Sequence, residues 1–273
     1  MKVEILAATN LEPRYLDCVV PFIKFVLTLR SSLPAVDFVP RVILTADAIP
    51  STLSNYAEFI DTYPTSLPSG FVAQNIRTLN ASLSSTDIVI TSDIDMMPLT
   101  AKAFDTGLRS LLDHPTAFVV LRNVLEPGQY PICYNLATPE VFREVTGAED
   151  EKSISQHLQQ ILDRTVTQVG YDGQHGGAGW YSDQEHLFTA VEKFREQHPH
   201  RALLFNDNAT GHRRLDRAGK RGRLRWFWLG FVFFGLYTDY HVHHPVPVYR
   251  HFINAIYRVS RRTTESCVPR TGS

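Results

Sequence analysis

Two aspartates offer the clearest chemistry in this sequence. Asp93 and Asp95 follow a β-branched run at residues 88–90, which predicts a buried strand ending just before them. Carboxylates one residue apart can face one crevice if the chain bends there, and such hard oxygen ligands suit Mg²⁺ or Mn²⁺. Ligands of open α/β sheets bind beyond the carboxyl ends of the strands, so the pair predicts a cation site that would hold a diphosphate. The alternative is an ordinary turn or helix cap before Pro98.

The segment Ser-Asp-Ile-Asp at 92–95 resembles the D-x-D motif of nucleotide-sugar-dependent glycosyltransferases of the GT-A fold. Later segments resemble the same family in the same order, at residues 134–137 (Tyr-Asn-Leu-Ala), 180–184 (Trp-Tyr-Ser-Asp-Gln) and 240–245 (Tyr-His-Val-His-His-Pro). The resemblance implies an α/β protein with a Rossmann-like, mixed and mostly parallel sheet flanked by helices. It also implies a nucleotide diphosphate sugar donor, with UDP as the expected nucleotide, and Mn²⁺ or Mg²⁺.

The resemblance assigns roles to individual residues. Asp95 and His241 would bind the metal, and Asp93 would bind the metal, the ribose or a metal-bound water. Asp183 and Gln184 would face the sugar or the acceptor hydroxyl, with Asp183 as general base or positioning group. The alternative for Asp183 is a cap at the start of the following helix.

Three histidines near the C-terminus are candidates for the metal ligand. His241 and His243 would share one face of a strand, so either could reach Asp95, and His244 follows directly. His241 aligns best with the histidine of the family.

The first part of the chain predicts a nucleotide-binding βαβ unit. Residues 3–8 form an apolar strand, residues 15–29 a buried helix and residues 40–44 a second strand. The end of the first strand is expected at the base and ribose, through Ala8, Thr9 and Asn10. Asn10 could equally be a turn residue.

Two further polar residues are assigned to the nucleotide sugar. Arg77 falls outside the apolar face of the helix expected from Ser69, and we expect it to reach the nucleotide rather than remain an exposed surface arginine. Asn135 ends an apolar strand expected over residues 130–137. A buried amide needs a partner, which could be a sugar hydroxyl or a backbone group.

The segment 212–237 is strongly basic and then aromatic. It predicts a C-terminal elaboration that suits a phosphate-rich surface, such as single-stranded nucleic acid or a membrane interface. Arg214 and Arg217 could instead compensate the charge of a leaving diphosphate. A surface loop followed by a core strand is the plain alternative.

Composition sets the limits for these assignments. The chain has 273 residues, 44% hydrophobic and 20% charged, with a formal net charge of −1, so no global field recruits nucleic acid. We expect one domain over residues 1–262, with a nucleotide half at 1–100 and an acceptor half at 101–262, and a flexible tail at 263–273.

Cys18, Cys133 and Cys267 form no C-x-x-C motif, and no apolar run is long enough to span a membrane. A reducing location is expected: the cytoplasm, or the host cytoplasm or nucleus for a viral protein.

The sequence therefore predicts a metal-dependent hexosyl- or pentosyltransferase that acts on a hydroxyl of a glycan, a lipid or a hydroxylated nucleobase in DNA. One alternative is a D-x-D phosphatase with an aspartyl nucleophile, although Met97 stands where such enzymes place Thr or Val. The other is a nucleic-acid or membrane-binding module that uses residues 212–237.

Overall fold

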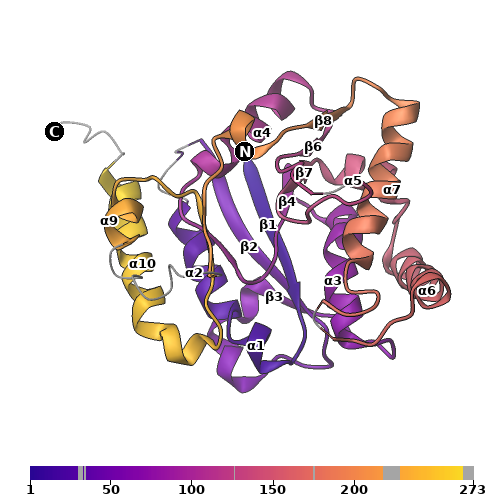
Figure 1. Ribbon diagram of the computed structural model, residues 1–273, viewed down its shortest axis with the longest axis horizontal. Coiled ribbons are helices and arrows are strands. Elements are labelled where there is room, and N and C mark those ends of the chain that lie inside the picture. Colours follow the sequence, from indigo (N-terminus) through magenta and orange to yellow (C-terminus); the bar gives the residue numbers. More distant parts are fainter. Residues whose placement is uncertain (30–32, 34, 126, 175, 218–227, 267–273) are drawn as a thin grey trace.

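A seven-stranded mixed sheet forms the centre of the molecule (Figure 1). The computed structural model describes residues 1–29, 33, 35–125, 127–174, 176–217 and 228–266. The strand order is β3-β2-β1-β4-β7-β6-β8. These strands are β1 (Lys2–Thr9), β2 (Asp37–Leu44), β3 (Ile60–Thr62), β4 (Ile88–Thr91), β6 (Phe118–Val120), β7 (Asn135–Ala137) and β8 (Ala202–Leu204).

The central strands are apolar at nearly every position because helices cover both faces of the sheet. In β1 every residue from Val3 to Thr9 is buried, and Ile5 pairs in parallel with Pro40 of β2 and Ile90 of β4. Only β7 runs antiparallel to its neighbours β4 and β6. The predicted mixed, mostly parallel sheet flanked by helices is therefore confirmed.

Each face of the sheet has its own hydrophobic cluster. One cluster packs α2 (Val19–Leu29), α4 (Lys102–Asp113) and α10 (Val246–Ser266) against the sheet. The other packs α3 (Ser69–Asn80), α5 (Pro139–Thr146), α6 (Glu151–Gln168) and α7 (Ser182–Gln197). Figure 1 shows α2, α9 and α10 on one side of β1 and β2, and α3, α6 and α7 on the other.

A second, three-stranded sheet joins distant parts of the sequence. It consists of β5 (Met96–Pro98), β10 (Asp239–His241) and β9 (Arg214–Leu215), in the order β5-β10-β9. Met96 pairs antiparallel with His241, so the D-x-D loop between β4 and β5 is tied by backbone to the C-terminal histidines. The remaining short elements are α1 (Pro13–Leu16), η1 (Ser51–Phe59), η2 (Ala81–Leu83), α8 (Asp207–Thr210) and α9 (Trp228–Phe233).

Several expected elements have different bounds. The helix expected at 15–29 is two helices, α1 and α2, and the second begins at Val19. Pro21 therefore falls in the first turn of α2, where its missing backbone N–H breaks no hydrogen bond within the helix. The strand expected over 130–137 is limited to β7.

The C-terminal part also departs from the expected elements. The end of the aromatic run forms helix α9, not a strand, and residues 218–227 of the basic segment lie outside the described residues. Helix α10 continues to Ser266, into the range 263–273 where a flexible tail was expected, and residues 267–273 lie outside the described range. No helix in the described ranges is long and apolar enough to cross a bilayer.

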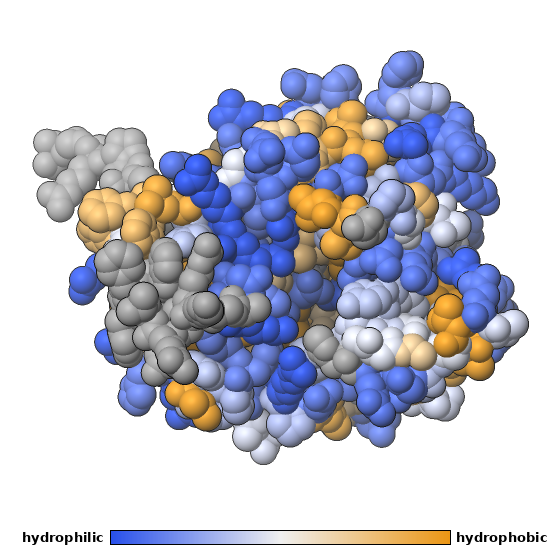
Figure 2. Space-filling view, in the orientation of Figure 1, coloured by the Kyte–Doolittle hydropathy of each residue, from blue (hydrophilic) through white to orange (hydrophobic). Residues whose placement is uncertain are grey.

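The surface in Figure 2 is mostly hydrophilic on the side shown, with separate hydrophobic patches. One patch lies over α9, where Phe233 is 53% and Phe234 is 74% exposed.

Candidate active site

A cavity of about 550 Å³ opens where β1 and β4 end. Its wall includes the end of β1, the D-x-D loop, the first half of α3, the start of α7 and the C-terminal histidine segment. Of the predicted site residues it brings together Ala8, Thr9, Asn10, Arg77, Asp93, Asp95, Asp183, Gln184, Arg217 and His241. Asn135 and Arg214 do not line it.

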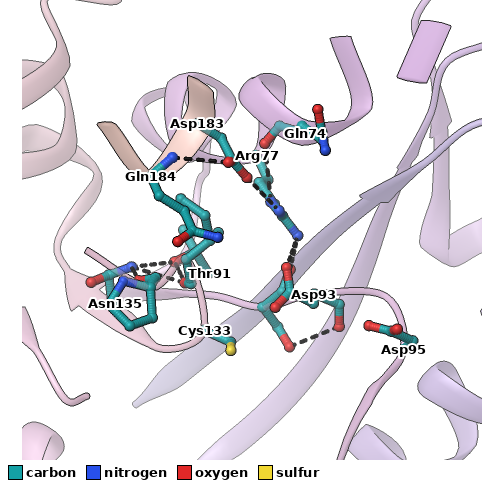
Figure 3. Close-up of polar contacts among 12 residues, drawn as sticks. Gln74, Arg77, Thr91, Asp93, Asp95, Cys133, Asn135, Asp183 and Gln184 are labelled. Atoms are coloured by element: carbon teal, nitrogen blue, oxygen red, sulfur yellow. Dashed lines mark hydrogen bonds and ion pairs between the residues drawn. The ribbon is translucent and has the colours of Figure 1, made fainter. Parts of the chain in front are cut away.

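Arg77 bridges two carboxylates at the floor of this cavity (Figure 3). Its guanidinium donates to Asp93 Oδ1 through Nη1 and to Asp183 Oδ2 through Nη2, the latter at 2.8 Å. Further donations to the carbonyls of Ser92 (3.1 Å) and Gln74 (3.1 Å) leave the side chain 8% exposed. Arg77 is therefore buried, and not on an open helix face as the sequence suggested, because two acidic partners compensate its charge.

Asp183 is the second residue of α7 and does not act as its N-cap, a position held by Tyr181. Its Oδ1 accepts the backbone N–H of Gln184 at 2.9 Å, while its Oδ2 accepts from Arg77. Burial raises the pKa of Asp183 to about 6, and the nearby Asp93 adds to the rise, although Arg77 opposes it. A carboxyl with such a pKa at the wall of a cavity suits acid–base work near neutral pH.

Asp95 stands at the other end of the loop and holds a different set of partners. Its Oδ2 lies 2.6 Å from Arg217 Nη1, 3.2 Å from His241 Nε2 and 3.3 Å from His244 Nε2. Burial alone would raise the pKa of Asp95, but the histidine hydrogen bonds and the charge of Arg217 hold it well below the usual range. Asp95 is therefore ionised at neutral pH.

The donor set around Asp95 suits a divalent cation held partly by substrate. No group of three or more His, Cys, Asp or Glu side chains in the described ranges is arranged to hold a metal ion. Mg²⁺ is, however, usually held by one or two protein ligands together with substrate phosphates. The 3.2 Å between Asp95 Oδ2 and His241 Nε2 fits two ligands on adjacent corners of an octahedron, which lie about 3 Å apart at metal bonds of about 2.1 Å.

A second carboxylate stands behind His241. Asp216 Oδ1 lies 3.4 Å from His241 Nδ1, on the opposite side of the ring from Asp95. A carboxylate on the outer nitrogen is the usual way to orient a metal-binding imidazole. Sequence reasoning missed Asp216, although its position one residue before Arg217 could have drawn attention to it.

The three candidate histidines differ in whether they reach Asp95. His243 turns into the core, where its Nδ1 lies 2.8 Å from the hydroxyl of Tyr240 and its ring packs against Tyr249 and Phe252. It does not share the face of His241 because β10 ends at His241 and strand alternation stops there. His244 is the second histidine that reaches Asp95.

The side chain of Asn135 is buried and does not line the cavity. Its side-chain amide donates to the carbonyls of Pro131 and Ile132, both at 2.8 Å, and to Thr91 Oγ1 at 3.3 Å. Figure 3 shows this group set apart from Arg77 and its carboxylates. The amide nitrogen thus has backbone partners, whereas the buried Oδ1 has no hydrogen-bond partner among the described residues, and the side chain is fully buried.

Arg214 also points away from the cavity. Its guanidinium contacts the fully buried carboxylate of Asp239 (3.3 Å) and the thiol of Cys133 (3.3 Å). His212 Nε2 lies 3.1 Å from the other oxygen of Asp239. Because Asp239 begins β10, this cluster fixes the strand that carries His241.

Aromatic residues complete the cavity, and sequence reasoning assigned them no role of their own. Tyr15, Tyr171, Trp180 and Tyr181 line it, and Gln74 Nε2 donates to the carbonyl of Trp180 at 3.2 Å. The signal available in the sequence was the glycine-rich stretch 170–179. Its Gly179 has φ +73°, and a Cβ there would lie 2.8 Å from the carbonyl oxygen of Gly170.

These observations define an α/β protein with a cavity of about 550 Å³, lined by charged and aromatic side chains, at the carboxyl ends of a mostly parallel sheet. No protein-family model matches the chain, and no curated protein matches its sequence significantly.

Among solved structures, the chain is similar to mouse xyloside xylosyltransferase 1 in its apo form, at 10% identity and a TM-score of 0.46, with 89% of this chain and 98% of that chain covered. It is similar to the galactosyltransferase LgtC in complex with donor and acceptor sugar analogs (11% identity, TM-score 0.43, 99% and 98% covered). A third is the mannosyltransferase PcManGT from Pyrobaculum calidifontis in complex with GDP-Man and Mn²⁺ (13% identity, TM-score 0.42, 99% and 76% covered). At such identities and scores the likeness is one of chain arrangement, and an activity must come from the site.

Proposed function

We propose that this protein transfers a sugar from a nucleotide diphosphate sugar to a hydroxyl acceptor with the help of a divalent cation. The observation that carries the proposal is the convergence on one cavity of the end of β1, the D-x-D loop, Arg77, Asp183 and His241. These groups come from five separate parts of the sequence, and a cavity of about 550 Å³ has the size of a small-molecule site.

The donor occupies the end of the cavity formed by β1 and α3. Ala8, Thr9 and Asn10 face the base and ribose, with UDP as the nucleotide we test first. Asn10 Oδ1 also accepts the backbone N–H of Glu12 at 3.1 Å, so the turn that follows β1 keeps this side chain in place. Asp93, fixed by Arg77, presents its second carboxylate oxygen to the ribose or to a metal-bound water.

Asp95 and His241 would hold Mn²⁺ or Mg²⁺, with Asp216 orienting the imidazole from behind. A cation there supplies positive charge to the diphosphate as it departs. Arg217, whose guanidinium lines the same cavity, adds a second positive group for the phosphates.

Asp183 and Gln184 act at the acceptor side of the cavity. With a pKa of about 6, Asp183 is ionised at neutral pH and can accept the hydrogen bond of an attacking hydroxyl and take up its proton. Arg77 fixes the direction of this carboxylate, and the half-buried Gln184 lies beside it at the start of α7 (Figure 3).

Measuring turnover at increasing ionic strength distinguishes the possible classes of acceptor. A hydroxylated base in DNA would bring phosphate contacts, so its turnover falls steeply as ionic strength rises, whereas a neutral glycan hardly responds. The described part of segment 212–237 contributes Arg217 to the cavity, while Phe233 and Phe234 of α9 are exposed.

The phosphatase alternative would use Asp93 as an aspartyl nucleophile. Arg77 pairs with Oδ1 of this carboxylate, so the attack on phosphorus would fall to Oδ2. Removing nucleotide from the assay and offering a simple aryl phosphate tests this alternative directly.

The first experiment is calorimetric titration of nucleoside diphosphates into the wild-type protein and the Asp95→Ala variant, with Mn²⁺ and with chelator. We expect one diphosphate to bind with Mn²⁺, and binding to be lost with chelator or with Asp95→Ala. Asp113→Ala, which changes an exposed aspartate at the end of α4, is the matched control and should bind as the wild type. If no nucleoside diphosphate binds the wild type in either condition, the proposal is wrong.

A further inference from the structure

Arg217 and the proposed cation need the same atom. Arg217 Nη1 lies 2.6 Å from Asp95 Oδ2, the oxygen that also faces His241 Nε2 and His244 Nε2. This oxygen has about two lone pairs and already faces three nitrogen atoms, so a cation that binds it must displace one of these donors. A guanidinium at this distance would also repel a divalent cation.

Within the described ranges, Arg217 has contacts few enough to be exchanged. Besides Asp95, its Nη1 reaches the carbonyl of Val242 at 3.3 Å, a long hydrogen bond. The side chain is 19% exposed and lines the cavity, so a diphosphate in the cavity is within its reach. Arginine also matches phosphate as well as it matches carboxylate, since both accept its paired N–H groups.

Building on the proposed function, we propose that Arg217 takes the place of the divalent cation at Asp95 while the cavity is empty and moves to the diphosphate when cation and nucleotide bind together. Arg217 thereby acts as an internal competitor of the metal. Its release by the cation provides a phosphate ligand, so each of the two ligands strengthens the binding of the other, as linkage requires.

This arrangement makes the Asp95 site selective for the complete donor complex. A free cation must displace Arg217 and leave the guanidinium without a carboxylate, which lowers its affinity. A cation that arrives with a diphosphate offers Arg217 a new anionic partner, and this penalty disappears. The protein would therefore bind little Mn²⁺ in the absence of nucleotide.

The test is titration of Mn²⁺ without nucleotide, read as the electron paramagnetic resonance signal of free Mn²⁺. Arg217→Gln keeps most of the side-chain length but removes the charge, and we expect it to bind Mn²⁺ about tenfold more tightly than the wild type, within the usual range of coupling between sites. Arg217→Lys retains a positive charge and should bind Mn²⁺ as weakly as the wild type.

Arg213→Gln is the matched control, because Arg213 lies in the same segment but is exposed. It should leave Mn²⁺ affinity unchanged. Circular dichroism of every variant checks that each is folded, and Arg217→Lys keeps the comparison meaningful if the neutral variant is damaged.

Equal or weaker Mn²⁺ binding by Arg217→Gln would overturn the inference, as would the absence of binding in all variants. The second part is tested by adding nucleoside diphosphate, which should tighten Mn²⁺ binding more in the wild type than in Arg217→Gln. If Arg217→Gln tightens Mn²⁺ binding but no nucleotide binds any variant, the competition at Asp95 stands and the transferase proposal fails.

Discussion

Asp93 and Asp95 are separated by one residue, yet an arginine of a different kind compensates each of them. Arg77 comes from the middle of α3, is 8% exposed, and is held by two carboxylates and two backbone carbonyls. Arg217 follows the short strand β9 and is 19% exposed, and among the residues that the structure describes it is held by one carboxylate and one carbonyl. The first pair is part of the framework, whereas the second can exchange its partner for a ligand.

Arg77→Ala breaks the framework pair and should have the largest effect on stability. It leaves Asp93 and the deeply buried Asp183 without their cation, and removing one partner of a buried pair costs about 3–5 kcal/mol. Urea unfolding measures this loss in the free energy of unfolding. The exposed pair of Arg109 and Asp105 on α4 is the control, and Arg109→Ala should leave stability nearly unchanged.

A loss of under about 1 kcal/mol in Arg77→Ala, the range of exposed pairs, would contradict the distinction between the two arginines.

The pH dependence of stability tests how the framework pair holds Asp183. Its pKa is about 6 in the folded protein against an ordinary value of 3.8, so between these values the folded protein keeps a proton that the unfolded chain has lost. This contribution to the free energy of unfolding is complete at low pH and disappears as the pH rises through about 6.

Denaturation of the wild type and Asp183→Asn across pH 3.5–7 isolates the effect. Other carboxyls titrate in both proteins, so the difference between the two curves reports Asp183. Relative to Asp183→Asn, the wild type should lose stability as the pH rises; a difference that is flat, or that grows in favour of the wild type, contradicts the raised pKa.

Asp216→Asn tests the support of the exchangeable site. Asp216 faces the outer nitrogen of His241, and loss of such a carboxylate usually lowers metal affinity about 10- to 100-fold. Titration of Mn²⁺ in the presence of saturating nucleoside diphosphate measures the change, with Asp113→Asn as the exposed control. Unchanged affinity would remove Asp216 and His241 from the cation site.

The smallest predicted effect separates His243 from its neighbours. Tyr240→Phe removes the hydroxyl that lies 2.8 Å from His243 Nδ1 and should cost about 1 kcal/mol of stability. Nucleotide and Mn²⁺ affinities should stay as in the wild type, because this pair faces the core and not the cavity. Reduced Mn²⁺ affinity in Tyr240→Phe would return His243 to the list of metal ligands.

The sequence predicted those parts of the site that follow from local pattern. The strand before Asp93, the nearly continuous apolar run that forms β1 and the helix that opens at Ser182 are local features, so the residues at their ends could be placed at one edge of the sheet.

Contacts between distant segments were beyond such reasoning. The burial of Arg77 depends on Asp183, 106 residues away. His244, and not His243, contacts Asp95 because β10 ends at His241. The side chain of Asn135 donates to the carbonyl of Pro131, which lies in a segment that was expected to be a strand. Each of these outcomes is set by tertiary packing, which overrides propensity and spacing.

The pairing of β5 with β10 has a consequence for the order in which the chain is made. Val242 donates its backbone N–H to the carbonyl of Asp95 at 2.9 Å, and His241 follows Asp95 by 146 residues. At synthesis rates of about 5–20 residues per second, the histidine leaves the ribosome about 7–30 s after the aspartate. The strands β1, β2 and β4 can pair during that interval, but the nascent chain lacks one wall of the cavity until the last part is made. A half-made chain can thus have the centre of its sheet in place before the cavity is complete.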